Sequence, residues 1–377
     1  MRFSFRRASI AVTWGVPLAV AVAIAAIVAG REAEPPTPNG PPPRVVGPGG
    51  PLIPAPISPD AYTAPSLAFS PDGRDLAAGW VESGSPIVAL RDVGTGRERW
   101  RIAPPVSESL CLAFSPDGLS LAVGPSERGD SGPMKLYDVR DGEERSPSKS
   151  AGRLSYYQHL AFSPDGRYVA GTRQGRVWVL NESKDESPWE GRLDSRELYD
   201  VAFSPDGRYV AAAGDGPMKC RGFAAFGFSS WSCGVKGGAV GLWDVATGER
   251  LLDLQPPQRA RTVAFSPDGS TLASGGWDGL RLWSLPEGRG RWVVSGRVER
   301  LAYTTDGRSL ALLIGKTYEA EAIDEVWIWD VTAERVRTIL RGVPGSPRAL
   351  AFSPDGRAVV VGGDEGIVRW DLETERG

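Results

Sequence analysis

Short apolar runs alternate with short polar turns along most of this chain, and the alternation repeats. A unit begins with a run such as Ser66-Leu67-Ala68-Phe69, which is followed at once by Ser-Pro-Asp-Gly. A second apolar run comes after the turn, for example Tyr209-Val210-Ala211-Ala212. Runs this short, rich in Val and aromatic residues and bounded by Pro, Asp and Gly, predict β-strands rather than helices.

The turn and the strand before it recur seven times. Six copies of Ala-Phe-Ser-Pro-Asp-Gly start at Ala68, Ala113, Ala161, Ala202, Ala264 and Ala351. A seventh, altered copy runs from Ala302 to Gly307 and reads Ala-Tyr-Thr-Thr-Asp-Gly. Successive copies start 38 to 62 residues apart, which is the spacing of repeated supersecondary units. The sequence therefore predicts seven equivalent units.

Each unit has room for four strands. The third run usually ends in an aromatic residue and Asp, as in Trp243-Asp244, and a Thr-Gly turn then leads to a fourth run at Arg250–Leu254. In the first turn, Pro fixes φ near −65° and Gly takes the left-handed conformation that closes a tight hairpin. Four short antiparallel strands per unit, repeated seven times, predict an all-β, seven-bladed β-propeller.

At this point the sequence resembles the WD40-repeat β-propeller family over residues 51–372. The likeness rests on the turn after the first strand and on the Trp-Asp ending of the third. The Gly-His dipeptide that usually precedes the first strand in this family is absent, and the chain's one histidine, His159, stands in a different position. The family's His-centred network is therefore not expected here, and Trp, Phe and Val packing must replace it. TolB-type propellers, which also use Ser-Pro-Asp-Gly turns, are the alternative resemblance.

The last unit stops soon after Trp370-Asp371-Leu372, before its own fourth strand. We expect residues near Leu52-Ile53-Pro54-Ala55 to supply that outer strand and close the ring, as is common in the family. An outermost strand tolerates Pro because one of its edges needs no partner. The predicted propeller domain is then residues 51–377, and we expect it to be monomeric.

The first 33 residues predict a membrane anchor. Arg2, Arg6 and Arg7 precede an uncharged segment, Ala8–Gly30, which as a helix would be about 34 Å long. The excess of Arg before the segment places the N-terminus in the cytoplasm and the propeller on the other side of the membrane. A cleaved signal peptide, which would make the protein secreted, and a buried soluble helix remain as alternatives. Residues 34–50 are Pro-rich and predict an extended linker.

Three long insertions fall between the second and third strands of their units: Gly124–Pro133, Gly214–Gly238 and Ile314–Asp324. The family's geometry implies that they share one face of the ring, opposite the Ser-Pro-Asp-Gly turns. Length variation on one rim of a regular scaffold is typical of binding loops. The middle insertion carries the candidate partner contacts, which are Phe223, Phe226, Phe228 and Trp231. Packing of these rings onto the propeller itself is the competing interpretation.

Cys220 and Cys233 flank these aromatic residues, and in an exported protein they are candidates for a disulfide. Cys111 lies within an apolar run and is expected to be a buried thiol.

Composition excludes several classes of function. The net charge is −3, and Arg259, Arg261, Arg297, Arg300 and Arg348 are spread through the repeats without a run or an aromatic ladder, so no nucleic-acid partner is expected. One His and three Cys leave no recognisable metal site, and no cofactor is predicted. Gly315-Lys316-Thr317 lacks the preceding Gly and the following helix of a phosphate loop. The seven turn aspartates are expected to bond local backbone rather than form a catalytic site.

These features favour a non-catalytic, membrane-tethered scaffold that binds a protein or peptide. A component of envelope assembly resembling TolB-type propellers is one alternative. A propeller hydrolase or lyase with carboxylates in the central channel is another. A fold alone does not decide among them.

Overall fold

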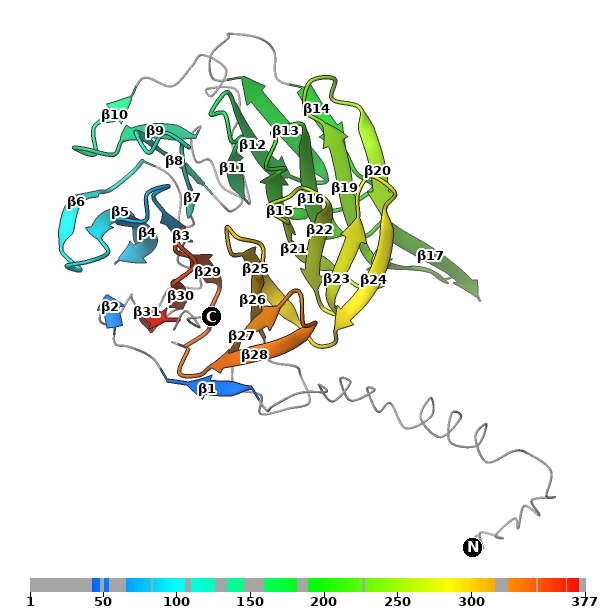
Figure 1. Cartoon of the computed structure of the whole chain (residues 1–377). Helices are drawn as coiled ribbons and strands as arrows, with labels where there is room; N and C mark the ends of the chain where they lie inside the picture. The colour runs from blue at the N-terminus through cyan, green and yellow to red at the C-terminus, as the bar shows by residue number, and fades with distance from the viewer. Residues whose placement is uncertain are drawn as a thin grey trace, which may run out of the picture. The chain divides into compact units, whose positions relative to one another are not determined.

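The structure is a computed structural model of the 377-residue chain, in which seven blades, each with four antiparallel strands, stand around a common centre (Figure 1). The predicted seven-bladed all-β propeller is therefore confirmed. The described residues are 43–47, 51–53, 66–82, 84–105, 110–125, 134–145, 159–181, 189–225, 228–315, 325–343, 345–363 and 365–372. Side chains are described in these ranges except at 51–53 and 218–234.

Every blade is built from four strands that run from the centre outward in the order a, b, c and d. Blade 1 is β3 (Ser66–Phe69), β4 (Asp75–Glu82), β5 (Ser85–Asp92) and β6 (Glu98–Ile102). Blade 2 is β7 (Leu110–Phe114), β8 (Ser120–Pro125), β9 (Lys135–Asp138) and β10 (Glu144–Arg145). Blade 3 is β11 (Leu160–Phe162), β12 (Tyr168–Arg173), β13 (Arg176–Asn181) and β14 (Trp189–Arg192).

Blade 4 is β15 (Leu198–Phe203), β16 (Tyr209–Asp215), β19 (Gly238–Asp244) and β20 (Arg250–Leu254). Blade 5 is β21 (Ala260–Phe265), β22 (Thr271–Gly276), β23 (Gly279–Ser284) and β24 (Arg289–Val294). Blade 6 is β25 (Val298–Tyr303), β26 (Ser309–Ile314), β27 (Glu325–Asp330) and β28 (Arg335–Leu340). Blade 7 is β29 (Ala349–Phe352), β30 (Ala358–Gly363), β31 (Gly366–Asp371) and β2 (Pro51–Ile53).

The ring closes where the sequence predicted. β2 pairs antiparallel with β31 and supplies the missing outer strand of blade 7. The turns give a second sign of closure, because a Cβ on Gly73 of blade 1 would come within 3.1 Å of Pro354 Cδ of blade 7. Gly73 has φ of +72°, so both its conformation and this approach favour glycine.

A further N-terminal strand lies outside blade 6. β1 (Arg44–Val46) pairs in parallel with β28, so that Arg44 lies opposite Thr338 and Val46 opposite Leu340 (Figure 1). The sequence predicted only an extended linker at this point. The three residues of β1 lie between Pro43 and Pro48, and they are too few to form a pattern of apolar and polar positions from which strand pairing could be predicted.

The core consists of apolar clusters between neighbouring blades. Trp243 of blade 4 is only 1% exposed and packs with Val177 and Val179 of blade 3. Trp rings also bond adjacent blades, since Trp100 Nε1 donates to the carbonyl of Val139 at 2.8 Å and Trp189 Nε1 to that of Val245 at 2.9 Å. Aromatic packing thus holds the blades together, as expected from the missing Gly-His element.

The predicted membrane helix within residues 1–33 lies outside the described residues. Across the part of the chain that the structure describes, no helix is both long and apolar enough to span a bilayer.

Candidate functional site

The propeller has two faces of different construction. Because the four strands of a blade alternate in direction, the a–b and c–d turns lie together at one end, here called the turn face. The b–c connections and the starts of the inner a strands lie at the opposite end, here called the loop face.

Each Ser-Pro-Asp-Gly turn on the turn face is closed by its own side chains. In blade 1, Ser70 Oγ donates to Asp72 Oδ1 at 2.7 Å and accepts from the Asp75 N–H at 2.9 Å. The same hydroxyl–carboxylate bond is present in all seven copies, and Thr304 supplies the hydroxyl in the altered one. The hydrogen bonds from the Ser70 hydroxyl and from the Arg74 backbone N–H lower the pKa of Asp72. The turn aspartates are therefore structural, as the sequence predicted.

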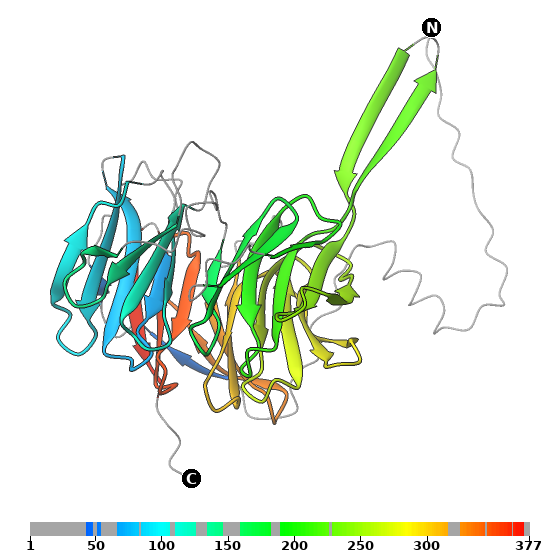
Figure 2. The ribbon, with the colours of Figure 1, turned by 90° about the horizontal axis from the view of Figure 1, so that it is seen from above.

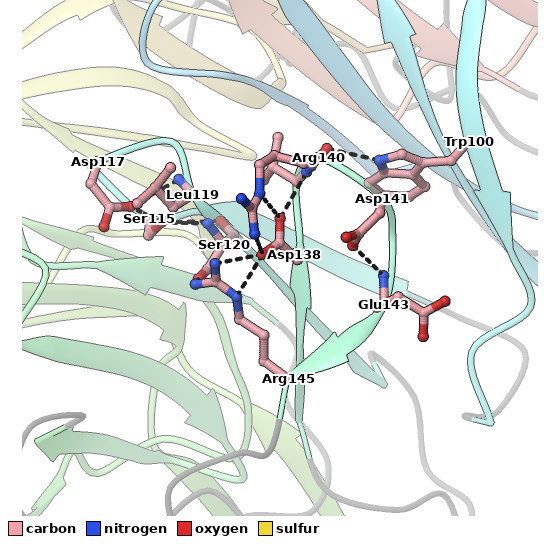
Figure 3. A network of polar contacts seen from close by, with 11 residues as sticks. Trp100, Ser115, Asp117, Leu119, Ser120, Asp138, Arg140, Asp141, Glu143 and Arg145 are labelled. Carbon is pink, nitrogen blue, oxygen red and sulfur yellow. Dashed lines mark hydrogen bonds and ion pairs between the residues drawn. The ribbon is translucent and has the colours of Figure 1, made fainter.

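A second carboxylate on the turn face is held by two arginines (Figure 3). Asp138 ends β9 and accepts from Arg140 Nη2 at 2.9 Å and from Arg145 Nη2 at 2.7 Å. Arg145 also donates to Ser120 Oγ at 2.7 Å. The hydrogen bonds from Arg140 and Arg145 hold the pKa of Asp138 well below its usual range. Charge on this part of the turn face is internally paired.

The loop face of blades 4 to 6 carries arginines stacked on aromatic rings. Arg259 and Arg297 both lie over the ring of Trp277, at 4.9 Å and 5.4 Å from its centroid. Arg261 lies 4.7 Å from the centroid of Tyr199. Trp277 Nε1 is buried and has no hydrogen-bond partner within the described ranges.

An acidic group links the two stacks. Tyr199 donates its hydroxyl to Asp215 Oδ2 at 3.1 Å, and Arg259 Nε lies 3.2 Å from Asp215 Oδ1. The sequence missed this cluster because Arg297 is far along the chain from Arg259 and Arg261, and Tyr199 and Asp215 come from another repeat. Their shared place near the start of inner strands was the signal that could have found it.

His159 has a structural contact rather than a catalytic setting. Its Nδ1 lies 3.0 Å from Asp200 Oδ1, and Asp200 Oδ2 accepts the Val263 N–H at 2.9 Å. Asp200 therefore joins blades 3, 4 and 5. Burial raises the pKa of this carboxyl, but the nearby His159 and the hydrogen bonds outweigh it and leave the pKa lowered.

The three predicted insertions each join the b and c strands of their blade and so belong to the loop face. Residues 126–133 and 316–324 of the first and third lie outside the described residues. The middle insertion forms a two-stranded hairpin of β17 (Met218–Ala225) and β18 (Phe228–Val235), which extends away from the ring (Figure 2).

The candidate contact residues follow this hairpin. Phe223 lies on β17, Phe228 and Trp231 lie on β18, and Phe226 falls outside the described residues. Cys220 is directly opposite Cys233 in the strand register. The role of the aromatic residues in partner contact and the pairing of Cys220 with Cys233 stay predictions.

The remaining cysteine is buried, as expected. Cys111 is 3% exposed, its Sγ donates to the Gly124 carbonyl at 3.3 Å, and burial raises the pKa of its thiol to about 12. Among the residues with described positions, no group of three or more His, Cys, Asp or Glu side chains is placed to hold a metal ion.

Comparison with known proteins finds WD40 repeats in the chain. The family model described as "WD domain, G-beta repeat" matches residues 189–216, 254–284 and 335–371. The first match begins at the outer strand of blade 3 and ends in blade 4, so the sequence repeat is staggered against the blade. The resemblance drawn from the turns and the Trp-Asp endings is confirmed.

Three curated relatives match parts of the chain. One is "Small ribosomal subunit protein RACK1" of Caenorhabditis elegans, 30% identical over 121 residues, or 29% of this chain and 35% of that protein. "Eukaryotic translation initiation factor 3 subunit I" of Lodderomyces elongisporus is 24% identical over 156 residues, 37% of this chain and 44% of that protein. "Telomerase protein component 1" of Rattus norvegicus is 25% identical over 138 residues, 36% of this chain and 5% of that protein. The matches thus span less than half the length of each relative.

Proposed function

Because this chain is a propeller that carries WD40 repeats, we propose that it is a non-catalytic scaffold that binds a protein or peptide on its loop face. The observation that carries the proposal is the difference between the faces. On the turn face the aspartates of the seven turns are bonded within their own turns. On the loop face, the guanidinium groups of Arg259 and Arg297 are stacked on the ring of Trp277, and that of Arg261 on the ring of Tyr199.

The chemistry of the loop face suits a protein partner. Arg and aromatic side chains are enriched at the centres of protein interfaces, where they supply area, hydrogen bonds and cation–π contacts. The stacked arginines are held in place by the rings beneath them, so less side-chain freedom is lost on binding. The hairpin β17–β18, with Phe223, Phe228 and Trp231 in its sequence, would extend the contact beyond the ring.

Site-specific photo-crosslinking tests this assignment in the full-length protein. A photoreactive residue replaces exposed Gln258 on the loop face, and a matched variant carries it at exposed Leu119 on the turn face. We expect a covalent adduct with one partner from the Gln258 position alone. Adducts from the Leu119 position only, or equally from both, would contradict the proposal.

We also propose that residues 1–33 tether the propeller to a membrane, with the N-terminus cytoplasmic and the propeller on the far side. Support comes from the uncharged segment Ala8–Gly30 and the three arginines before it. Full-length protein should resist extraction from membranes by alkaline carbonate, and protease added outside sealed cells should cut it. A propeller shielded from that protease overturns the orientation, and recovery of a mature N-terminus in the medium favours the secreted alternative.

A further inference from the structure

The outer strand of each blade has one edge that the other three strands leave unpaired. Such an edge can pair with a strand of another chain, and proteins protect it with charged residues, proline, short length or a covering segment. Five of the seven outer strands are protected in one of these ways. The outer strands β6 and β14 carry charge pairs, of Arg101 with Glu98 and of Arg192 with Glu190. Strand β10 has two residues, β2 has three and begins with Pro51, and β1 covers β28.

The other two outer strands, β20 and β24, differ in their charges. β20 carries an ion pair between Arg250 and Asp253, whose nitrogen and oxygen atoms are 3.5 Å apart. The charged residues of β24 are both positive, Arg289 and Arg291, and the strand ends in the uncharged run Trp292-Val293-Val294. No strand of the described residues pairs with the outer edge of β24 (Figure 1). This edge is therefore the least protected of the seven.

Blade 6 shows that an outer edge of this ring accepts a further strand. β1 pairs in parallel with β28 and places Val45 opposite Ile339. Ile339 in turn lies opposite Trp327, the third residue of β27. In the same way, Trp292 lies opposite Arg281, the third residue of β23. Trp292 therefore has in blade 5 the position that β1 covers in blade 6.

Trp292 also differs from the tryptophans of the other outer strands. Trp100 of β6 and Trp189 of β14 donate their Nε1 atoms to carbonyls of a neighbouring blade. Trp292 makes no such bond within the described ranges and is 46% exposed. The Arg281 guanidinium lies 4.5 Å from the centroid of its ring and holds it in place. The exposed part of this ring is therefore a preformed surface for an apolar side chain.

The charges along β24 favour an acidic segment. Arg291 pairs with Glu334 at 2.7 Å. Arg289 is exposed, and its side chain pairs with no carboxylate among the described residues. Arg289 stands three residues before Trp292 on the strand. On a strand added in the direction of β1, an acidic residue beside Arg289 would likewise come three residues before the residue beside Trp292.

We propose that an extended segment of a partner protein binds along β24 as a fifth strand of blade 5. An apolar side chain of this segment packs against Trp292, and an acidic side chain three residues earlier lies beside Arg289. Main-chain hydrogen bonds to the free edge supply affinity, and the two side chains supply selectivity. The site is on the outer wall of the ring, so it is separate from the loop face and goes beyond the proposed function.

The test uses full-length protein in detergent and two libraries of short fluorescent peptides rich in Thr and Val. Every peptide has Phe at one fixed position, and the residue three places before it is Glu in one library and Lys in the other. Binding is followed by fluorescence anisotropy. We expect the Glu library to bind about 5-fold more tightly, because a cross-strand attraction replaces a repulsion. Equal affinities, or binding of neither library, would overturn the proposal.

Hydrogen exchange tests whether the segment adds as a strand. The Glu library at saturation should slow the exchange of the amides of β24 and leave those of β20 unchanged, because new main-chain hydrogen bonds form on one edge only. Binding without protection of β24 would mean that the peptide is held by side chains alone, and the proposal would then be wrong.

Variants locate the binding to the two side chains. Trp292→Ser should lower the affinity for the Glu library about 10-fold, because it removes the aromatic contact. Leu251→Ser is the matched control on β20, where Leu251 is 42% exposed, and it should change nothing. Arg289→Glu should reverse the preference, so that the Lys library binds more tightly, which a merely structural role would not produce. Unchanged affinity in Trp292→Ser, or an unreversed preference in Arg289→Glu, overturns the inference.

Light scattering distinguishes a partner segment from a second copy of this chain. We expect one chain per particle after correction for detergent. A dimer that Trp292→Ser converts to monomers would assign the edge to a second copy and overturn the proposal. Crosslinking from position 258 would persist in every one of these cases, so failure of this site is distinguishable from failure of the proposed binding face.

Discussion

The two faces of the ring are made by the same strands but satisfy their charged groups differently. On the turn face, Asp72 and its six equivalents bond a hydroxyl of their own turn, and Asp138 lies between two arginines. On the loop face, Arg259 and Arg297 are stacked on the ring of Trp277 instead, and Arg261 on that of Tyr199. Stacking holds a guanidinium group in place without occupying all of its N–H donors. We propose that this difference suits the turn face to stability and the loop face to binding.

The largest expected effect comes from removing one hydroxyl of the turn face. Ser204 is 1% exposed, donates to Asp206 at 2.6 Å and accepts the Tyr209 N–H at 2.9 Å. Ser204→Ala leaves that N–H unpaired, and we expect the free energy of unfolding to fall by about 1–3 kcal/mol in denaturant titrations. Arg348→Ala on the loop face should change it by less than about 0.5 kcal/mol.

Ser204→Thr is the matched control, because Thr304 makes the same contacts in blade 6 at 2.6 Å and 3.0 Å. It should restore most of the lost stability. A loss as large in Arg348→Ala as in Ser204→Ala would remove the distinction between the faces.

A titration within blade 5 sharpens the comparison. Asp268 lies on the turn face, where the Ser266 hydroxyl lowers its pKa, whereas burial raises the pKa of Asp278 on the loop face although Arg281 opposes it. Carboxyl carbon shifts followed by NMR should place the pKa of Asp268 below the ordinary value of about 3.9 and that of Asp278 above it. The reverse order would contradict the assignment of the two environments.

These shifts have opposite consequences for stability. The folded state binds the Asp268 proton more weakly than the unfolded state does. The ionised carboxylate therefore stabilises the fold above about pH 4, and this stabilisation is lost as the pH falls through the lower folded pKa. Asp278 opposes folding at neutral pH, and this penalty disappears as the pH falls through its raised pKa. Asp268→Asn should therefore make the free energy of unfolding fall less steeply as the pH is lowered. Asp278→Asn should make it fall more steeply.

The sequence predicted those features that depend on local chemistry. Seven turns, seven blades and closure near Leu52 follow from residues that act on their immediate neighbours, such as Pro and Gly in the turn. The pairing of β1 with β28 could not be predicted, because it joins segments almost 300 residues apart. The arginine cluster was missed for the same reason. Arg259, Arg261 and Arg297 belong to two repeats, and only the packing of neighbouring blades brings them over Trp277 and Tyr199.

A smaller effect is expected from the stacked pair on the loop face. Arg259 lies 4.9 Å from the centroid of Trp277, and a double-mutant cycle of Arg259→Gln and Trp277→Leu should give a coupling of about 0.5–1 kcal/mol. The cycle separates this contact from the ion pair of Arg259 with Asp215. The pair Arg208 and Tyr209, at 5.3 Å on the turn face, is the control. It should couple less because the two residues are adjacent in the chain and do not join separate strands. Absence of coupling at Trp277 would mean that the stack does not position Arg259.

The smallest effect on the ring concerns the hairpin, whose two strands form a sheet of their own. Ala225 and Phe228 flank a two-residue connection and so form the hydrogen-bonded pair next to the turn. Pairs alternate along the ladder, which makes Cys220 and Cys233, five steps further, a non-hydrogen-bonded pair with Cα atoms about 4.5 Å apart. That separation permits a disulfide.

We expect unreduced protein to take up no iodoacetamide, because Cys111 is buried, and to take up two equivalents after mild reduction. Reduction should leave the unfolding midpoint of the propeller unchanged, because the hairpin sheet is separate from the sheet of blade 4. It should speed proteolysis within residues 218–235, since the crosslink is the only covalent restraint on a two-stranded ribbon that is marginal by itself. Labelling of both cysteines without reductant would contradict the pairing. It would also weaken the proposed extracytoplasmic location, because such thiols are oxidised in exported proteins.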